Sequence, residues 1–351
     1  MDQKVRDAFA DRVYEEVNGA MSVLTMYVGE RLGLFRALES TGPVTADGLA
    51  LRLQLNERYV REWLGCMAVN GYIDHDHTNG TFRLSPEHAD VLTNPESPAY
   101  AMPYVRYVPS FSSTLAALVT AFRTGGGVAF EAYGPDLVSA IGEGNRPFLL
   151  HDLVSKWIPA MPDVESRLRQ GGRVADVGCG EGWLSILLAQ AFPRVQCDAV
   201  EPDARSIASA RENALQAGVG DRIRFHGSPL ETADIAGPFD LIAAVECIHD
   251  LVRPVSVLRR MRSLLDPGGA VLIVDEAGGE TIDENRTLAG RILYNFSVLH
   301  CLPQAMTEPG SAATGAVMSV STFQRYARDA GFTRVDVLPI ANPLWRFYRL
   351  G

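Results

Sequence analysis

Long apolar runs, paired cysteines and an excess of basic residues are all missing from this 351-residue chain. No apolar run reaches the roughly 18–20 residues that a membrane-spanning helix needs, which argues against an integral membrane protein. Lys and Arg number 32 against 42 Asp and Glu, so the net charge is −10. This charge argues against nucleic-acid partners, because proteins that bind nucleic acids neutralise phosphates with clustered cations.

Cysteine usage and the start of the chain both bear on the cellular compartment. The five cysteines are scattered and form no Cys-x-x-Cys pair, which predicts reduced core thiols instead of a disulfide framework or zinc ribbon. The first residues lack the charge and apolar pattern of a signal peptide, so we expect a cytoplasmic protein. An apolar content of 47% is typical of a globular protein, and the length predicts two domains.

The most informative stretch is residues 174–182, which read Val-Ala-Asp-Val-Gly-Cys-Gly-Glu-Gly and precede an apolar helix pattern. A strand, a glycine turn and a helix are typical of nucleotide sites, because glycine lets a ligand lie against bare backbone. The spacing Asp-x-Gly-x-Gly-x-Gly differs from the pattern of dinucleotide binders. An acidic residue before the turn, Asp176, favours a ligand with a cationic amino group. Glu201 ends the next strand, where a carboxylate can accept both ribose hydroxyls.

These elements together resemble a class I S-adenosylmethionine (SAM) methyltransferase over roughly residues 165–351. The resemblance is carried by 174–182, Glu201, Phe239-Asp240-Leu241-Ile242 and residues 265–273. It implies an α/β, Rossmann-like methyltransferase sheet and SAM as cofactor. Ser228 occupies the place where family members often bind the adenine amino group with an acidic residue. The residues expected to bind SAM are Asp176, Gly178, Gly180, Gly182, Glu201, Ser228 and Glu246.

The first 100 residues predict a mostly helical winged-helix domain. Helix patterns with caps at Thr45 and Asn56 are followed by two extended runs around Asn79-Gly80, a strong hairpin signal. Arg58 and Arg61 stand beside acidic residues, which does not favour reading DNA bases. In methyltransferases of the type that the chain resembles, this domain dimerises. The apolar series from Val13 to Leu32 is also too extensive to leave in water, so we expect a homodimer.

The remaining chain divides into a bridge over residues 101–164 and the methyltransferase domain over 165–351. Pro- and Tyr-rich residues 94–110 predict a loop, followed by a short helix over 113–122. Strand and helix patterns alternate after residue 165, which implies a parallel sheet covered on both faces. Residues 279–320 interrupt the alternation and predict a lid over the substrate.

Three residues are candidates for catalysis. His249 and Asp250 follow the fourth strand of the predicted sheet, and His300 lies in the insert. Residues 246–250 and 301–303 resemble an actinobacterial-type branch of small-molecule methyltransferases. The two histidines and Asp250 resemble the metal ligands of enzymes that methylate the carbon beside a 2-oxo acid carbonyl. This resemblance implies a divalent metal, iron or zinc, that stabilises an enolate. We expect the neighbouring Cys301 to point away from the metal.

Two other functions fit the same residues. An O- or N-methyltransferase of secondary metabolism would need only His249 as a general base. A regulator could bind DNA with the winged helix and use the second domain as a ligand sensor. The substrate is a small molecule in the first two interpretations, and either Arg106 or Arg123 could hold a substrate carboxylate.

Overall fold

The computed structural model describes all residues from 1 to 351 and divides the chain into two compact units. One unit consists of 1–112 with 143–147, and the other of 113–142 with 148–351. No helix has the combination of length and hydropathy that crossing a membrane requires. The assignment of separate roles to 1–100, 101–164 and 165–351 stays a prediction.

The first unit is the predicted winged helix. Its elements are α1 (Gln3–Arg31), α2 (Leu34–Thr41), α3 (Ala46–Leu53), α4 (Glu57–Val69), β1 (Asp74–Asp76), β2 (Thr81–Arg83), α5 (Pro86–Leu92) and the first half of α6 (Met102–Thr124). Trp63 on α4 donates to the carbonyl of Thr25 on α1 over 3.0 Å, and its indole leaves no room for a Cβ at Gly29. The glycine therefore lets these two helices approach closely.

The local signals of this unit are confirmed. Thr45 Oγ1 accepts from the backbone N–H of Gly48 at 3.2 Å, and Asn56 Oδ1 accepts from that of Arg58 at 3.0 Å. Both are N-caps of the predicted kind. The hairpin turns at Asn79-Gly80, between β1 and β2, as predicted. Arg58 and Arg61 form exposed ion pairs with glutamates four residues away, so α4 presents a neutralised face.

Helix α6 corrects the prediction for residues 94–110. It runs from Met102 to Thr124 and includes Pro109 in its interior. Proline is a helix breaker because it lacks an N–H and its ring crowds the preceding turn, which is why the sequence predicted a loop. Buried apolar side chains along the helix, such as those of Val105, Phe111 and Leu118, outweigh that cost.

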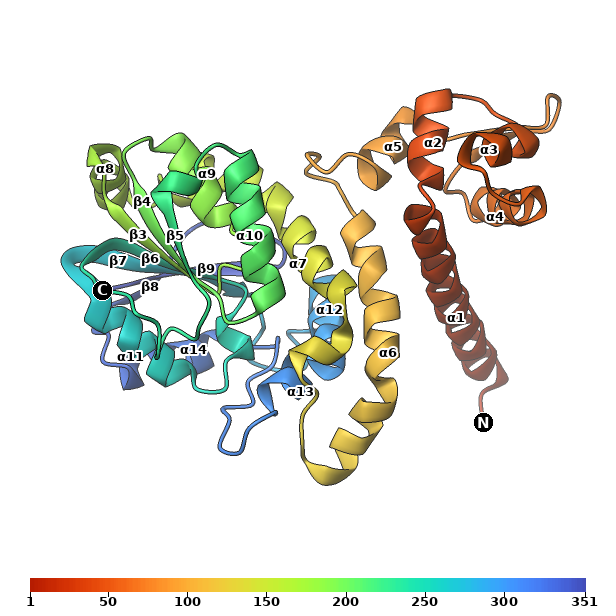
Figure 1. The fold of residues 1–351 in the computed structure, drawn as a ribbon. Helices are drawn as coiled ribbons and strands as arrows, with labels where there is room; N and C mark the ends of the chain where they lie inside the picture. The colour runs from red at the N-terminus through yellow and green to blue at the C-terminus, as the bar shows by residue number, and fades with distance from the viewer. The chain divides into compact units, whose positions relative to one another are not determined.

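The second unit is an α/β domain around a seven-stranded sheet with the order β5-β4-β3-β6-β7-β9-β8 (Figure 1). The strands are β3 (Arg173–Val177), β4 (Gln196–Val200), β5 (Ile223–His226), β6 (Phe239–Val245), β7 (Leu265–Glu276), β8 (Val335–Val337) and β9 (Trp345–Leu350). The neighbouring strands β5, β4, β3, β6 and β7 are parallel to one another, as predicted. Strand β9 is antiparallel to both of its neighbours, β7 and β8. The sheet is thus a mixed Rossmann-like sheet.

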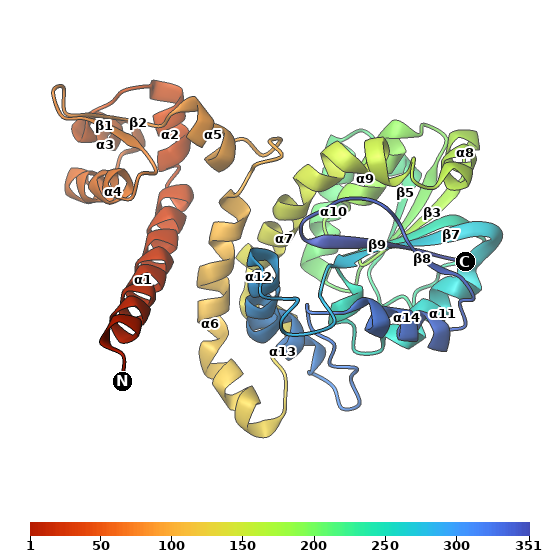
Figure 2. The same cartoon turned by 180° about the vertical axis from the view of Figure 1, so that it is seen from behind.

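Helices cover both faces of this sheet and bury a core on each (Figures 1 and 2). The helices are α8 (Pro162–Gln170), α9 (Trp183–Ala191), α10 (Ala204–Gln216), α11 (Pro254–Leu264) and α14 (Val320–Asp329), and α7 (Pro135–Phe148) precedes them in the chain. One core includes Leu168 of α8 and Leu188 of α9, and the other includes Leu258 of α11 and Phe323 of α14. Two buried layers explain why β3, β6 and β7 are apolar on both sides.

The second unit contains two π-helical segments. Leu149–Trp157 follows α7, and Ser297–Cys301 lies in the insert between α12 (Leu288–Phe296) and α13 (Leu302–Ala305). The second lies within residues 279–320, for which the sequence predicts a lid over the substrate. Because π-helices are rare and often mark functional sites, the insert is a candidate for part of the functional site.

Candidate functional site

The glycine turn after β3 is held by three residues with positive φ. Gly178, Gly180 and Gly182 have φ of 69°, 51° and 82°, a region that side chains with a Cβ rarely adopt. A Cβ on Gly178 would lie 2.9 Å from the Sγ of Cys247. The turn therefore needs glycine for its backbone conformation and, at Gly178, for space.

Asp176 is buried one residue before the end of β3. Its Oδ2 accepts hydrogen bonds from the backbone N–H and the hydroxyl of Ser185, at 3.2 and 2.8 Å. Burial raises the pKa of Asp176 to about 6, against the opposing effect of those hydrogen bonds. The carboxylate thus anchors the first turn of α9, and its predicted contact with a ligand amino group stays a prediction.

Glu201 ends β4 beside the turn. Its Oε2 accepts from the N–H of Gly180 at 3.1 Å, and its Oε1 accepts from the N–H of Asp203 at 2.8 Å. Burial raises the pKa of Glu201. Both strand-end acids are therefore tied to backbone, which fixes the direction of their carboxylates. Ser228 follows β5, the outer neighbour of β4, and is half-buried.

Glu246 follows β6 with φ of 50°, an unusual conformation for a residue with a side chain. Its backbone N–H donates to the carbonyl of Val274 at 2.8 Å, and its Oε1 accepts from the indole N–H of Trp345 on β9. Strained backbone that neighbouring contacts hold in place is common at functional sites.

His249 lies in a short 3-10 turn (Ile248–Asp250) after β6 and is 3% exposed. Its Nδ1 is 2.6 Å from Oδ1 of Asp275, which ends β7 with Glu276, and its Nε2 is 3.2 Å from Oδ1 of Asp250. Burial alone would lower the pKa of His249, but the carboxylates of Asp250 and Asp275 raise it well above its ordinary value. The imidazole is thus oriented by one carboxylate and faces another.

His300 is buried in the π-helical part of the insert. Its ring meets Tyr133 edge-on at 4.7 Å and lies 5.9 Å from the ring of Phe130. The Tyr133 hydroxyl donates to the carbonyl of Leu299 at 2.9 Å, which binds the segment before α7 to the insert. Burial lowers the pKa of His300, so the imidazole is held neutral.

Cys301 does not point away, which corrects the prediction. The structure gathers one ligand atom each from His249, Asp250 and Cys301 within 4.8 Å of one another. The Sγ of Cys301 is also 3.7 Å from Nδ1 of His300. The prediction assumed α-helical geometry, whereas a π-helix has a wider turn and rotates the following side chain by a different angle.

The two arginines considered for a substrate carboxylate differ in their surroundings. Arg106 is buried in an ion pair with Glu30 and in another with Glu143, whose carboxylate lies 2.9 Å away. Arg123 is exposed near the end of α6. Arg106 is therefore committed to a structural network.

Asp275 is the residue that sequence reasoning missed. It is fully buried, and its Oδ2 accepts from the backbone N–H of Ile248 at 3.1 Å while Oδ1 faces His249. Acidic residues at the ends of adjacent parallel strands meet at one sheet edge, which was the available signal.

Models of two known families match two separate parts of the chain. The model of an Rv2258c-like winged HTH domain matches residues 19–94, and the model of a methyltransferase domain matches residues 168–318. A ubiquinone biosynthesis O-methyltransferase of Pseudomonas paraeruginosa is 28% identical over 182 residues, which are 51% of this chain and 73% of that protein.

Solved structures share the fold over nearly the whole chain. Mitomycin 7-O-methyltransferase MmcR is 20% identical with a TM-score of 0.68, covering 99% of each chain. Human N-acetylserotonin methyltransferase, solved with SAM, is 19% identical with a TM-score of 0.69, covering 100% of this chain and 98% of its own. The resemblance to a 2-oxo acid C-methyltransferase finds no counterpart among these. The chain is a SAM-dependent methyltransferase with a class I methyltransferase sheet and an N-terminal Rv2258c-like winged HTH domain.

Proposed function

We propose that this protein transfers the methyl group of SAM to a hydroxyl oxygen of a small molecule, with His249 as the general base. The observation that carries the proposal is the 2.6 Å contact between His249 Nδ1 and Asp275 at the carboxyl ends of β6 and β7. A carboxylate on Nδ1 keeps the proton there and leaves Nε2 to accept one from the substrate. Asp250 would steady the imidazolium that results.

The chemistry of this transfer needs little beyond alignment, since bound SAM supplies an already activated methyl group. We infer that Gly178, Gly180 and Gly182 form its cradle, because Cβ atoms there would strain the turn. Glu201 would accept the ribose hydroxyls, and Ser228 would lie near the adenine. Asp176 and Glu246 would act at the methionine end. Removal of the substrate proton by His249 is the step that the protein itself performs.

Relatives guide the choice of oxygen as acceptor. The curated relative and MmcR are both named as O-methyltransferases. Incubation with SAM and a panel of phenols, amines and 2-oxo acids, followed by mass spectrometry, tests the proposal. His249→Ala should abolish methylation of phenols, whereas His77→Ala, in the exposed wing, should not. Transfer only to nitrogen or carbon, or full activity in His249→Ala, would contradict it.

A second candidate is metal-assisted C-methylation of a 2-oxo acid. It is supported by the convergence of His249, Asp250 and Cys301 within 4.8 Å, with His300 beside them. Imidazole, carboxylate and thiolate are ligands that suit zinc or iron. In this version Cys301 joins or replaces His300 as the ligand from the insert, and the metal would stabilise the enolate.

Elemental analysis and chelation separate the two candidates. The C-methylation candidate expects a stoichiometric metal, loss of turnover with a chelator and recovery with divalent zinc or iron. Cys301→Ser and His300→Ala should each lose metal while the fold is preserved. Protein that methylates a phenol at full rate after exhaustive chelation would reject the metal.

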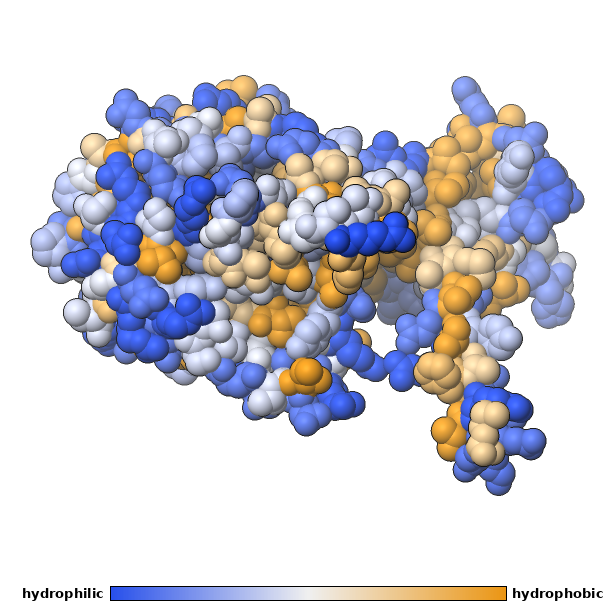
Figure 3. Space-filling view, turned by 90° about the horizontal axis from the view of Figure 1, so that it is seen from below, coloured by the Kyte–Doolittle hydropathy of each residue, from blue (hydrophilic) through white to orange (hydrophobic).

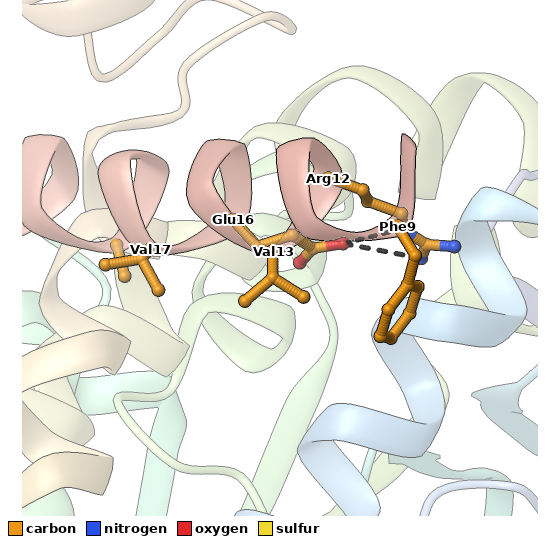
Figure 4. Close-up of a pocket in the computed structure, with 6 residues that line it drawn as sticks. Phe9, Arg12, Val13, Glu16 and Val17 are labelled. Atoms are coloured by element: carbon orange, nitrogen blue, oxygen red, sulfur yellow. Dashed lines mark hydrogen bonds and ion pairs between the residues drawn. The ribbon is translucent and has the colours of Figure 1, made fainter. Parts of the chain in front are cut away.

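The first unit supports a homodimer. Large apolar side chains are exposed along α1, and apolar residues are visible in the corresponding part of Figure 3. Phe9, Val13 and Val17 lie along the same side of the helix (Figure 4). A groove of about 670 Å³ between α1 and α4 is lined by apolar residues that include Leu32 and Tyr59. One copy of α1 could cover that of another in a self-complementary contact.

Light scattering tests the dimer. Val13→Glu combined with Val17→Glu should give monomers, because each carboxylate would be buried in the contact. Asp11→Lys, an exposed change on the same helix, should leave the dimer intact. A wild-type protein that stays monomeric at high concentration would refute the proposal.

A cytoplasmic location also stays a prediction, with all five cysteines free in the structure.

A further inference from the structure

Glu276 is a buried carboxylate that the proposed methyl transfer does not use. It is 9% exposed, and its Oε2 has no hydrogen-bond partner. Its backbone N–H donates to Asp275 at 2.8 Å, and its Cα is paired with Trp345 across β7 and β9. A buried hydrogen-bond acceptor without a donor costs free energy of folding. Such an atom therefore indicates a ligand that supplies the donor, or a functional site that tolerates the cost.

The surroundings of Glu276 carry an excess of negative charge. Burial raises the pKa of Glu276 well above its ordinary value, and among its neighbours the carboxylate of Glu246 raises it most. Asp250 and Asp275 add two further carboxylates, and the imidazole of His249 is the cationic partner among these groups. Glu246 is held by the indole N–H of Trp345, whereas Oε2 of Glu276 is left without a donor.

The strand order places the Glu276 carboxylate on the same side of the glycine turn as His249. The glycine turn follows β3, while Glu276 ends β7, which is two strands away. Neighbouring strands are about 4.8 Å apart, so roughly 10 Å separates the two positions along the sheet edge. His249 lies between them after β6 and is tied to β7 through Asp275. The carboxylate thus lies near the base His249, with Glu246 beside it, and two strand spacings from the glycine turn.

Aromatic side chains complete the environment. Trp345 lies 4.9 Å from the ring of Phe148 and 5.8 Å from that of Trp157. Aromatic faces and carboxylates together are the chemistry that binds an ammonium group, through cation–π attraction and charge-assisted hydrogen bonds.

We propose that Glu276 is a substrate-specificity residue that binds a cationic nitrogen on the methyl acceptor. The preferred substrate is then a hydroxyl compound that also carries an amine, with the hydroxyl at His249 and the ammonium at Glu276. This inference rests on the proposed O-methyl transfer and names the class of its acceptor. It also disfavours an acidic methyl acceptor, because the neighbouring carboxylates of Glu246, Asp250 and Asp275 would repel a further anion.

Three phenols that differ only in the end group test the inference by calorimetry. They are tyramine with an ammonium, tyrosol with a hydroxyl and 4-hydroxyphenylacetate with a carboxylate, each titrated into the full chain saturated with S-adenosylhomocysteine. Tyramine should bind at least about 10-fold more tightly than tyrosol, since a charge-assisted hydrogen bond is added, and the acid should bind most weakly. Glu276→Gln should remove the preference for tyramine, and Glu276→Asp should retain part of it. Glu231→Gln, an exposed change of the same charge, should behave like the wild type.

Several outcomes would overturn the inference. These are no binding of tyramine at millimolar concentration, equal binding of the three phenols, or a preference for tyramine that survives Glu276→Gln. A loss of S-adenosylhomocysteine affinity in Glu276→Gln with the order of the phenols unchanged would assign the carboxylate to the cofactor instead. Thermal melting of each variant confirms that it is folded. Because binding is measured without turnover, tyramine that binds but is not methylated on oxygen would count against the proposed reaction alone.

Discussion

Asp275→Asn is the substitution that tests the proposed base most directly. Asp275 Oδ1 faces His249 and the N–H of Glu276, and Oδ2 accepts from the N–H of Ile248 at 3.1 Å. An asparagine has one acceptor oxygen for these donors. If its amide nitrogen faces His249, the imidazole must carry its proton on Nε2, which is the wrong tautomer for a base. If its amide nitrogen faces Ile248, two donors oppose each other.

The size and direction of the effect follow from the same contacts. Carboxylates raise the pKa of His249 against the effect of burial, and a base acts in its neutral form. The wild-type rate should therefore rise as the pH passes that raised pKa. Loss of a charge-assisted hydrogen bond worth about 1.5–3 kcal/mol should move this rise to lower pH by roughly 1–2 pH units. The plateau rate should fall about 10²- to 10⁴-fold because the tautomer is no longer fixed.

The assay is the pH profile of kcat/KM, measured by mass spectrometry with an acceptor that the panel identifies. Calorimetry with SAM serves as the control, since Asp275 lies away from the glycine turn and cofactor affinity should stay close to that of the wild type. A variant with the wild-type plateau and an unshifted profile would refute the role of the His249–Asp275 pair. A lower rate with an unshifted profile would assign Asp275 a purely structural role.

Three further predictions concern the cofactor turn and the first unit. Glu201→Ala should weaken SAM binding about 10- to 100-fold in calorimetry, and unchanged affinity in folded protein would refute its role. Because the pKa of Asp176 is raised to about 6, its stabilising contribution is present below pH 4 and lost as the pH rises through 6. Asp176→Asn should therefore raise the melting temperature of the ligand-free protein by a few degrees at pH 7 and much less at pH 4; equal changes would contradict the shift. Arg106→Met should lower the free energy of unfolding of the first unit by about 3–5 kcal/mol, because Glu30 stays buried without its partner; denaturant titration would show a smaller loss if water reaches that carboxylate.

Much of the fold could be predicted from local sequence signals. The glycines of the turn, the caps Thr45 and Asn56 and the Asn79-Gly80 hairpin each depend on a few adjacent residues, and the structure confirms them. Alternating strand and helix patterns also gave the sheet, because apolar periodicity reflects burial on each face. Helix α6 could not be predicted in this way. Pro109 disfavours a helix locally, and the helix forms because tertiary packing outweighs that local preference.

The candidate site was only partly predictable for a different reason. His249 and Asp250 were found because they follow a predicted strand. Asp275 was missed because its importance depends on the register of β6 against β7, where Val245 pairs with Val274, and single residues do not disclose that register. The direction of the Cys301 side chain depends on a π-helical turn, and no residue in Ser297–Cys301 predicts such a turn from the sequence.

The course of the chain between its two units has a consequence for how such proteins can be recombined. The chain passes from one unit to the other within α6, returns within α7 for residues 143–147, and leaves again at residue 148. Domain boundaries more often fall in exposed linkers, where a single cut separates the parts. Here a chimaera that joins the front of one relative to the back of another would need three matched junctions, all of them inside helices. The two halves can therefore diverge together more easily than they can be exchanged.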